Sequence, residues 1–350
     1  MVPSIRPPFV RAFLAAFAIA IAGAASARTP YADRPEVIEF ANQIAKRHKL
    51  EAASILKSLR QAKHQATIVR WMEPLPPSQR SWKAYAGRTL TSSRIDEGVQ
   101  FWTANQAALV RAHERFGIPP EIIVSIIGVE TNYGKNTGSW RVLDALTTLA
   151  FDYPRRGAFF RSELEYFFVY AKETGTDVEA LKGSYAGALG IPQFMPGSYL
   201  RYAIDFDGDG RRDLVNNVVD AIGSVGNFLS EHGWQPNEPV AFPVSLTGEA
   251  HQLPLSAGIE PRFRVGELDQ YGITLNGAAL NQPVNEDALC ALIEFETPNK
   301  PSEFWIGLKN FYVITRYNQS SFYAMSVNAL AEAVKAKMSP PIQPVPPPGQ

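Results

Sequence analysis

The sequence predicts an α+β fold that is mainly α-helical and carries one small antiparallel β domain. Two periodicities along the chain predict it. From about residue 36 to residue 232, apolar residues recur every three or four positions, as they do in helices buried along one face. Between residues 240 and 317, apolar and polar residues alternate in short runs, as they do in the strands of a half-buried antiparallel sheet.

The composition is that of a globular chain without a strongly charged partner. The 350 residues are 45% apolar and 19% charged, enough for two or three packed domains. This excludes a fully disordered chain, a collagen and a multi-span membrane protein. Because 34 basic residues balance 34 acidic ones, we expect neither nucleic acid nor an anionic membrane as the main partner. The single cysteine, Cys290, excludes an intrachain disulfide, and its apolar neighbours predict a buried thiol.

Residues 1–27 have the three parts of a secretory signal peptide. Arg6 and Arg11 form a positive n-region, residues 13–22 form an apolar h-region, and residues 25–27 (ASA) form a cleavage site. We therefore expect an exported, soluble, periplasmic protein without a membrane span in the mature chain. An uncleaved anchor helix is the alternative, although the apolar run is short for a membrane span.

Breaks in the pattern divide the mature chain into segments. Pro119 and Pro120 open a helix, because proline is best tolerated in the first turn, and Gly134 is expected to end it. One helix is expected before this pair, at about 98–117, and further helices at about 141–150, 157–173, 177–182, 221–232 and 320–336. Strands are expected in the runs VAFPVSL, PRFRVGEL, GITLNG, DALCALIEFE, FWIGL and FYVITRY. The predicted organisation is an N-terminal helical domain (28–117), a core (118–235), a small β domain (236–317), a C-terminal helix that packs back on the helical region (318–338) and a disordered Pro-rich tail (339–350).

Glu130 is a carboxylic acid on the apolar face of a predicted hydrophobic helix. Ile127, Ile126 and Ile123 precede it by three, four and seven positions, so the four side chains share one face. Burial and the negative end of the helix dipole both raise the pKa of a carboxyl. A carboxyl that stays protonated near neutral pH can act as a general acid.

A plain structural role for Glu130 is the alternative, as a buried partner of Arg155 or Arg156. The polar residues 131–133 that follow Glu130 favour function, because they predict that this helix end lines a cleft.

Six long motifs follow one another between residues 128 and 327. They are GVETNYGKNTG (128–138), YPRRGAFF (153–160), SYAGALGIPQFMPGSY (184–199), DFDGDGRRDL (205–214), DAIGSVGNFL (220–229) and ITRYNQSSFYAMSV (314–327). Together they resemble the lytic murein transglycosylase B family, and the resemblance covers about residues 36–336. Well-known members carry a lipid on an N-terminal cysteine, which this chain lacks, so it resembles the soluble variants.

The resemblance implies a lysozyme-like core for residues 118–235 and a role in cell-wall turnover. It implies cleavage of the bond between N-acetylmuramic acid and N-acetylglucosamine in peptidoglycan glycan strands, with a 1,6-anhydro product. Cell-wall synthesis proteins are possible further partners. The family's catalytic acid matches Glu130. Its substrate-binding residues match Ser184, Gln193, Arg155, Arg156, Tyr317, Asn318, Tyr323 and, upstream, Tyr85.

A single acid suits this reaction. Ordinary glycosidases need two carboxylates flanking the bond that breaks, and the candidate motifs offer Glu130 alone, since nothing in their spacing places Asp144 or Asp152 opposite it. One acid suffices when the sugar's own C6 hydroxyl is the nucleophile, because an intramolecular group has a large effective concentration.

The segment DFDGDG (205–210) matches the start of a calcium-binding loop. It places carboxylates at positions 1, 3 and 5 and a glycine at position 6. Position 12 is Asn216 rather than glutamate, so a later acid would have to replace it. The predicted ligands of a structural Ca²⁺ are Asp205, Asp207, Asp209, the backbone carbonyl of Arg211, and Asp220. A turn without metal is the alternative, and no organic cofactor is expected.

Two other functions remain open on the sequence. A hydrolytic muramidase or glucosaminidase on the same fold would add one water to the product. A non-catalytic, calcium-stabilised peptidoglycan-binding module would release no fragments.

Overall fold

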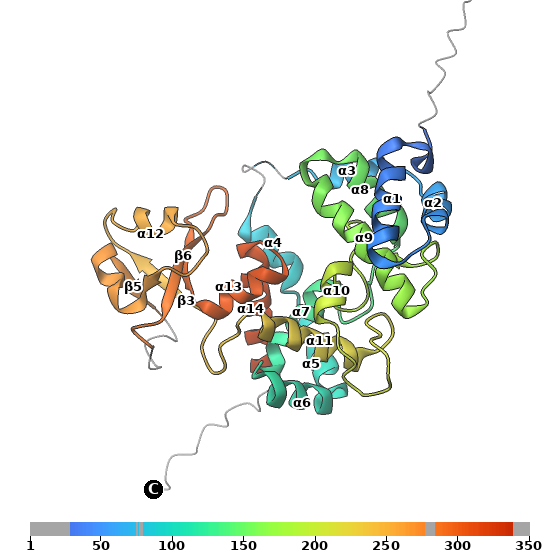
Figure 1. Ribbon diagram of the computed structural model, residues 1–350. Helices are drawn as coiled ribbons and strands as arrows, with labels where there is room; N and C mark the ends of the chain where they lie inside the picture. The colour runs from blue at the N-terminus through green and yellow to red at the C-terminus, as the bar shows by residue number, and fades with distance from the viewer. Residues whose placement is uncertain (1–28, 75, 77–79, 277–283, 339–350) are drawn as a thin grey trace, which may run out of the picture.

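The computed structural model describes residues 29–74, 76, 80–276 and 284–338. The predicted signal peptide and Pro-rich tail lie outside these residues. In Figure 1 a helical body carries the β domain on one side. No helix in the described part of the chain combines the length and the apolar character needed to cross a bilayer.

The upper lobe of the body in Figure 1 contains the N-terminal helices and two long helices from the middle of the chain. Its elements are η1 (Tyr31–Asp33), α1 (Pro35–His48), α2 (Ala52–Gln61), α3 (Ala66–Trp71), α8 (Val142–Asp152), η3 (Pro154–Arg156) and α9 (Gly157–Thr174). α8 packs along α9, and α3 lies on α8. Asp152 ties down the N-terminal segment, because its carboxylate accepts hydrogen bonds from Tyr31 at 2.6 Å and Arg34 at 2.8 Å.

The rest of the body surrounds one hydrophobic helix, α7 (Pro120–Thr131). Its other helices are α4 (Trp82–Thr89), α5 (Ser92–Ala104), α6 (Gln106–Phe116), α10 (Pro196–Tyr202), α11 (Val218–Glu231), α13 (Lys309–Tyr317) and α14 (Ser321–Met338). α14, α5, α11 and α6 pack against α7, and the side chains from Ile122 to Ile127 are at most 4% exposed. α7 is therefore buried over most of its length.

The β domain is a five-stranded antiparallel sheet with its own apolar core. Its elements are β3 (Ala241–Leu246), α12 (Gln252–Ser256), β4 (Phe263–Arg264), η4 (Val265–Tyr271), β5 (Ile273–Leu275), β6 (Leu289–Phe295) and β7 (Glu303–Gly307). The strand order is β4-β6-β7-β3-β5. Cys290 is fully buried in this core, and burial raises the pKa of its thiol to about 12, which confirms the predicted buried thiol.

One predicted strand is a helix. Residues 311–317 form most of α13, although their aromatic and β-branched side chains favour a strand locally. Phe311 and Ile314 are both buried, three positions apart, which is a helical spacing. The buried Asn310 fixes the start of this helix, since its side-chain amide donates to two backbone carbonyls in the segment 235–238 at 2.8 Å.

Two other predicted elements differ as well. Residues 265–271 form the 3-10 helix η4 in place of most of a strand. The helix predicted at 177–182 is instead a turn followed by β2 (Lys182–Gly183), which pairs with β1 (Trp140–Arg141). The turn forms because the Asp177 carboxylate accepts the backbone N–H two residues on at 2.8 Å, and aspartate favours turns in this way.

Two helix boundaries were also predicted wrongly. The segment 98–117 was expected as one helix, but α5 and α6 are separated at Asn105, whose side-chain amide donates to the carbonyl of Phe101 at 2.9 Å. α7 was expected to continue to Gly134, but Asn132 already takes up the left-handed conformation at φ 50°. Asparagine reaches this conformation more readily than other non-glycine residues.

Candidate active site

Glu130 projects from the C-terminal end of α7. The isoleucines on its helix face, Ile123, Ile126 and Ile127, are fully buried. Glu130 itself is half-buried, and the helix ends one residue later because Asn132 is left-handed. The carboxyl therefore lies where an apolar helix face meets the surface.

Burial controls the proton on Glu130. It raises the pKa of the carboxyl from the ordinary 4.5 to about 7, because the charged form loses its hydration. The hydroxyl of Tyr323 donates a hydrogen bond to Oε1 at 2.7 Å. That bond favours the charged form and lowers the pKa, but burial has the larger effect. Glu130 thus keeps its proton in a large share of molecules near neutral pH.

Three tyrosines from separate elements lie near Glu130. They are Tyr85 of α4, Tyr317 of α13 and Tyr323 of α14, and the negative charge on Glu130 adds to burial in raising the pKa of each hydroxyl. The rings of Tyr317 and Tyr323 are stacked, with centroids 6.3 Å apart and planes 14° apart. The Phe322 ring packs edge-on against Tyr85 at 5.8 Å. The fold therefore brings these predicted residues together with the acid.

The Gly-rich loop 184–194 is tied to both sides of this group. The hydroxyl of Tyr317 donates to the backbone carbonyl of Pro192 at 2.5 Å. At the end of α7, the hydroxyl of Thr131 donates to the carbonyl of Ile191 at 2.8 Å. The loop is consequently fixed beside the Glu130 carboxyl.

Ser184 and Gln193 lie near the two ends of this loop, and both are half-buried. The hydroxyl oxygen of Ser184 accepts the backbone N–H groups two and four residues on, at 3.3 and 2.9 Å. Gln193 has a φ of 53°, and its amide nitrogen donates to the carbonyls of Gly190 at 2.8 Å and Thr137 at 3.1 Å. Asn318 is exposed directly after α13. The hydrogen bonds hold Ser184 and Gln193 in fixed orientations.

The paired arginines, Arg155 and Arg156, have contact partners other than Glu130. Arg155 is exposed and pairs with Glu73 at 3.3 Å. Arg156 is exposed and lies over the ring of Phe159 at 4.4 Å. Among the described contacts of Glu130 there is none with Arg155 or Arg156. The structure therefore does not support the alternative in which Glu130 forms a buried ion pair with one of them.

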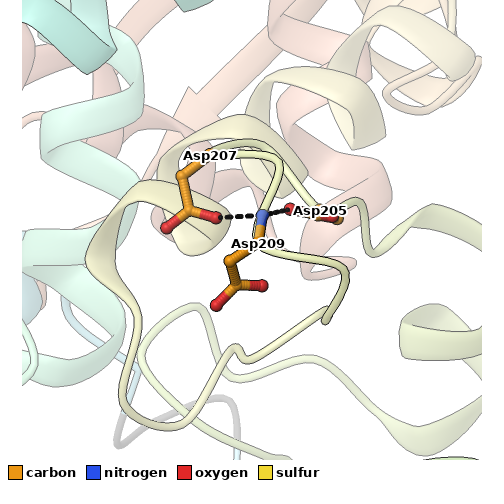
Figure 2. A group of neighbouring side chains, drawn as sticks. All are labelled: Asp205, Asp207 and Asp209. Atoms are coloured by element: carbon orange, nitrogen blue, oxygen red, sulfur yellow. Dashed lines mark hydrogen bonds between the residues drawn. The ribbon is translucent and has the colours of Figure 1, made fainter.

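Three carboxylates gather in the loop between α10 and α11. One oxygen from each of Asp205, Asp207 and Asp209 lies within 4.8 Å of the others. Figure 2 shows the backbone N–H of Asp209 between the other two carboxylates, donating to each at 3.2 Å. Gly210, at position 6 of the motif, has a φ of 89°, so the sharp turn that a calcium loop needs is formed there.

Asp220 lies outside this carboxylate group. It is fully buried, and its two oxygens accept the backbone N–H groups of Phe206 at 2.7 Å and Asp213 at 2.8 Å. These bonds close the loop onto the start of α11. The group of neighbouring carboxylates in the described residues therefore contains three of the four predicted aspartates. Asp220 instead holds the loop against α11 through its backbone hydrogen bonds.

The transglycosylase SLT domain is the family whose profile matches residues 32–332. The chain belongs to this family. It is a lytic transglycosylase.

Relatives of this lytic transglycosylase are similar over most of their length. The chain is 39% identical over 313 residues to the membrane-bound lytic murein transglycosylase B of Escherichia coli (strain K12), which covers 87% of the chain and 84% of the relative. Its fold is similar to catenated SltB1 from Pseudomonas aeruginosa, with a TM-score of 0.81, 40% identity and coverage of 88% and 100%. It is also similar to Escherichia coli Slt35 in complex with calcium, with a TM-score of 0.78, 39% identity and coverage of 88% and 95%. These comparisons confirm the predicted lysozyme-like, mainly helical α+β fold.

The two other acids considered from the sequence have structural partners in this transglycosylase. Asp144 accepts the backbone N–H of Lys63 at 2.9 Å. Asp152 is hydrogen-bonded to His64 at 2.8 Å, in addition to its bonds to the N-terminal segment. Both carboxylates therefore fasten α8 to the preceding chain.

Two of the three residues after Glu130, Thr131 and Tyr133, point inward, contrary to the prediction that they line the cleft, whereas the asparagine between them is half-buried. Thr131 is 1% exposed and Tyr133 is 9% exposed. The Tyr133 side chain fills a space that side chains at Gly98 and Gly128 would occupy. A Cβ at Gly98 would lie 2.6 Å from its hydroxyl oxygen, and a Cβ at Gly128 would lie 2.6 Å from its ring. The two glycines, one on α5 and one on α7, were the available signal for this close packing.

Proposed function

We propose that this transglycosylase cleaves the bond between N-acetylmuramic acid and N-acetylglucosamine in peptidoglycan without consuming water, and that Glu130 is its acid and base. The observation that carries the proposal is the place of Glu130, half-buried at the end of an apolar helix with the Tyr323 hydroxyl at 2.7 Å, where burial raises its pKa to about 7. A group with this pKa can give up a proton and take one back near neutral pH.

In the first step, Glu130 donates its proton to the glycosidic oxygen. The bond between that oxygen and C1 of the muramic acid breaks, the N-acetylglucosamine leaves with the proton, and C1 acquires oxocarbenium character. The tyrosines near Glu130 then lie beside a carboxylate, and the Tyr323 hydroxyl at 2.7 Å can stabilise its charge.

In the second step, the Glu130 carboxylate takes the proton of the C6 hydroxyl of the same sugar. The C6 oxygen bonds to C1, which gives 1,6-anhydro-N-acetylmuramic acid and restores the protonated acid. No water enters, because the hydroxyl on the same ring has the higher effective concentration.

The remaining residues are proposed to hold the glycan. Ser184, Gln193, Tyr85, Tyr317, Tyr323 and Asn318 supply hydroxyl and amide groups for the sugar's acetamido and hydroxyl groups. The fixed loop beside Glu130 supports this proposal. Side chains that are already held by hydrogen bonds within the protein lose less conformational entropy when a ligand binds. Arg155 and Arg156 are exposed, and arginine suits the lactyl or peptide carboxylates of peptidoglycan.

The acidic loop is proposed to hold a structural Ca²⁺. Asp205, Asp207 and Asp209 would supply carboxylate oxygens and Arg211 its backbone carbonyl, a set that suits a hard cation. The calcium complex of the relative Slt35 supports this proposal. The two charges of the ion would offset most of the repulsion among the three carboxylates and stiffen the loop between α10 and α11.

We further propose that the enzyme works in the periplasm on glycan strands, with cell-wall synthesis proteins as further partners. The signal-like residues 1–27 and the murein substrate in the name of the Escherichia coli relative support this place of action.

Mass spectrometry of fragments released from purified peptidoglycan tests the reaction. The proposal predicts fragments ending in 1,6-anhydro-N-acetylmuramic acid, and it predicts none from a Glu130→Gln variant. Fragments heavier by one water would show a hydrolase, and an absence of fragments with the unaltered chain would show a binding module.

A further inference from the structure

Three aromatic side chains from three segments meet on the surface of the upper lobe. Trp71 ends α3, Trp140 begins β1, and Tyr185 follows β2 by two residues. The Trp71 ring lies 5.7 Å from the Trp140 ring and 5.7 Å from the Tyr185 ring, nearly perpendicular to both. We call these three side chains the aromatic platform.

The platform is exposed to an extent that packing does not explain. Trp71 is 56% exposed and Tyr185 is 40% exposed, whereas Trp140 is half-buried and supports them. Single exposed apolar side chains are common on protein surfaces, but a contiguous group of large ones marks a binding surface. Tryptophan and tyrosine are also the side chains that offer much contact area at little entropic cost.

The platform is continuous with the candidate active site. β1 pairs with β2 so that Trp140 lies opposite Gly183, and Ser184 and Tyr185 follow at once. Gly138, just before β1, has a φ of 99°, and a Cβ there would lie 2.1 Å from the carbonyl oxygen of Gly183. Only glycine allows this approach, which joins the segment after Glu130 to the loop that carries Ser184.

On its other side the platform reaches the paired arginines. Glu73 lies two residues beyond Trp71 and accepts a hydrogen bond from Arg155 at 3.3 Å. Ser184 is followed in the chain by Tyr185, whose ring contacts Trp71. Glu73, two residues after Trp71, binds Arg155. These links form a series from Ser184 to Arg155. This series accounts for arginines that belong to the predicted site and yet do not contact Glu130.

We propose that the aromatic platform is a second contact for the glycan strand, on which sugars remote from the broken bond stack. Pyranose rings present an apolar C–H face that packs against aromatic rings, and their hydroxyls stay in water at the edges. The occupant is the substrate strand itself, because the platform continues the surface on which the strand lies at Ser184. This inference rests on the proposed function and extends it to substrate length.

The test compares Trp71→Ala with the unaltered enzyme on peptide-free glycan strands and on tetrasaccharides. We expect KM for long strands to rise about tenfold, the equivalent of about 1.4 kcal/mol for a lost stacking contact. We expect kcat on long strands and KM for tetrasaccharides to stay unchanged, and Trp71→Phe to restore most of the affinity. Leu253→Ala, which alters a side chain 60% exposed on the β domain, is the matched control and keeps both constants.

A binding measurement separates this inference from the proposed function. Calorimetry with Glu130→Gln protein follows binding of long strands with no cleavage, and adding Trp71→Ala to it is expected to weaken that binding about tenfold. Equal binding by the two proteins, or an equal loss for long strands and tetrasaccharides, overturns the platform. If the unaltered chain releases no fragments but the tenfold difference holds, the proposed reaction fails and the platform stands.

Discussion

Two acidic regions of this transglycosylase show how surroundings decide what a carboxyl does. Glu130 is half-buried at the end of an apolar helix, has one hydroxyl donor at 2.7 Å, and has its pKa raised to about 7. Asp207 is exposed in a loop, accepts a hydrogen bond from the Asn217 amide at 2.7 Å, and has its pKa lowered by that bond.

The difference lies in hydration and in the number of donors. Loss of water favours the protonated carboxyl, which can supply a proton. Water and hydrogen-bond donors favour the carboxylate, which can bind a cation. The same chemical group thus becomes an acid in one region and a candidate metal ligand in the other.

The sharpest way to break the comparison is to remove the proton donor. Glu130→Gln keeps the shape of the side chain and is expected to reduce release of fragments from peptidoglycan by about a thousandfold or more, since general acid–base catalysis is worth about 10²–10⁴ and here one group serves twice. Circular dichroism checks that the fold is kept. Glu121→Gln, on the same helix, is the control and should stay active; activity retained by Glu130→Gln would refute the role.

The same variant also tests the comparison through the sign of its change in unfolding free energy. A carboxyl with a raised pKa stabilises the fold below its ordinary pKa of 4.5, and that stabilisation is lost as the pH rises through about 7. Above pH 7, Glu130→Gln should therefore be more stable than the unaltered enzyme, by about 3 kcal/mol at most, and below pH 4.5 the two should be equal. Denaturant unfolding at both pH values measures this.

Asp207→Asn should show the opposite sign in the same experiment, performed in EDTA. A carboxylate with a lowered pKa contributes stability above its ordinary pKa and loses it as the pH falls. The variant should be the less stable protein at neutral pH and equal at low pH. The same sign for both variants would contradict the contrast between the regions.

Calcium tests the acidic loop directly. If calcium is about a hundredfold above its Kd, binding stabilises the fold by about 2.7 kcal/mol, so Tm in calcium should exceed Tm in EDTA by about 5–10 °C. Asp209→Asn should abolish most of this difference. Asp287→Asn, in an exposed pair with Arg264 on the β domain, should keep it. Identical melting of the unaltered enzyme in calcium and EDTA would refute a structural ion.

The smallest expected effect concerns Tyr323. Its hydrogen bond lowers the pKa of Glu130, so Tyr323→Phe should raise that pKa further. Because the acid must start protonated, kcat/KM should fall at a higher pH in the variant than in the unaltered enzyme. Tyr317→Phe, whose hydroxyl binds Pro192 instead, is the control and should leave this alkaline limb in place. If the alkaline limb of kcat/KM did not shift in Tyr323→Phe, the Tyr323 hydroxyl would not set the pKa of Glu130.

Local patterns predicted the parts of the fold that depend on local chemistry. The proline pair before α7, the isoleucines on the face of Glu130 and the spacing of the aspartates in the acidic loop all act within one element. The segment 311–317 misled because its strand-forming side chains are held in a helix by tertiary packing, including the buried Asn310.

Contacts between distant segments could not be predicted in this way. Trp71, Trp140 and Tyr185 are spread over more than a hundred positions, and only the pairing of β1 with β2 and the docking of α3 on α8 bring them together. The backbone partners of Asp220 could not be predicted for a similar reason, since the folded loop brings Phe206 and Asp213 to its carboxylate.

The pKa of Glu130 is the quantity on which the proposed reaction depends most directly. Carbon-13 NMR of the glutamate carboxyls, with the Glu130 signal assigned by its loss in Glu130→Gln, measures it in the intact enzyme. The structure predicts a titration midpoint near 7. A midpoint near the ordinary value of 4.5 would mean that the carboxyl is ionised at neutral pH, and it would contradict the role of Glu130 as the proton donor.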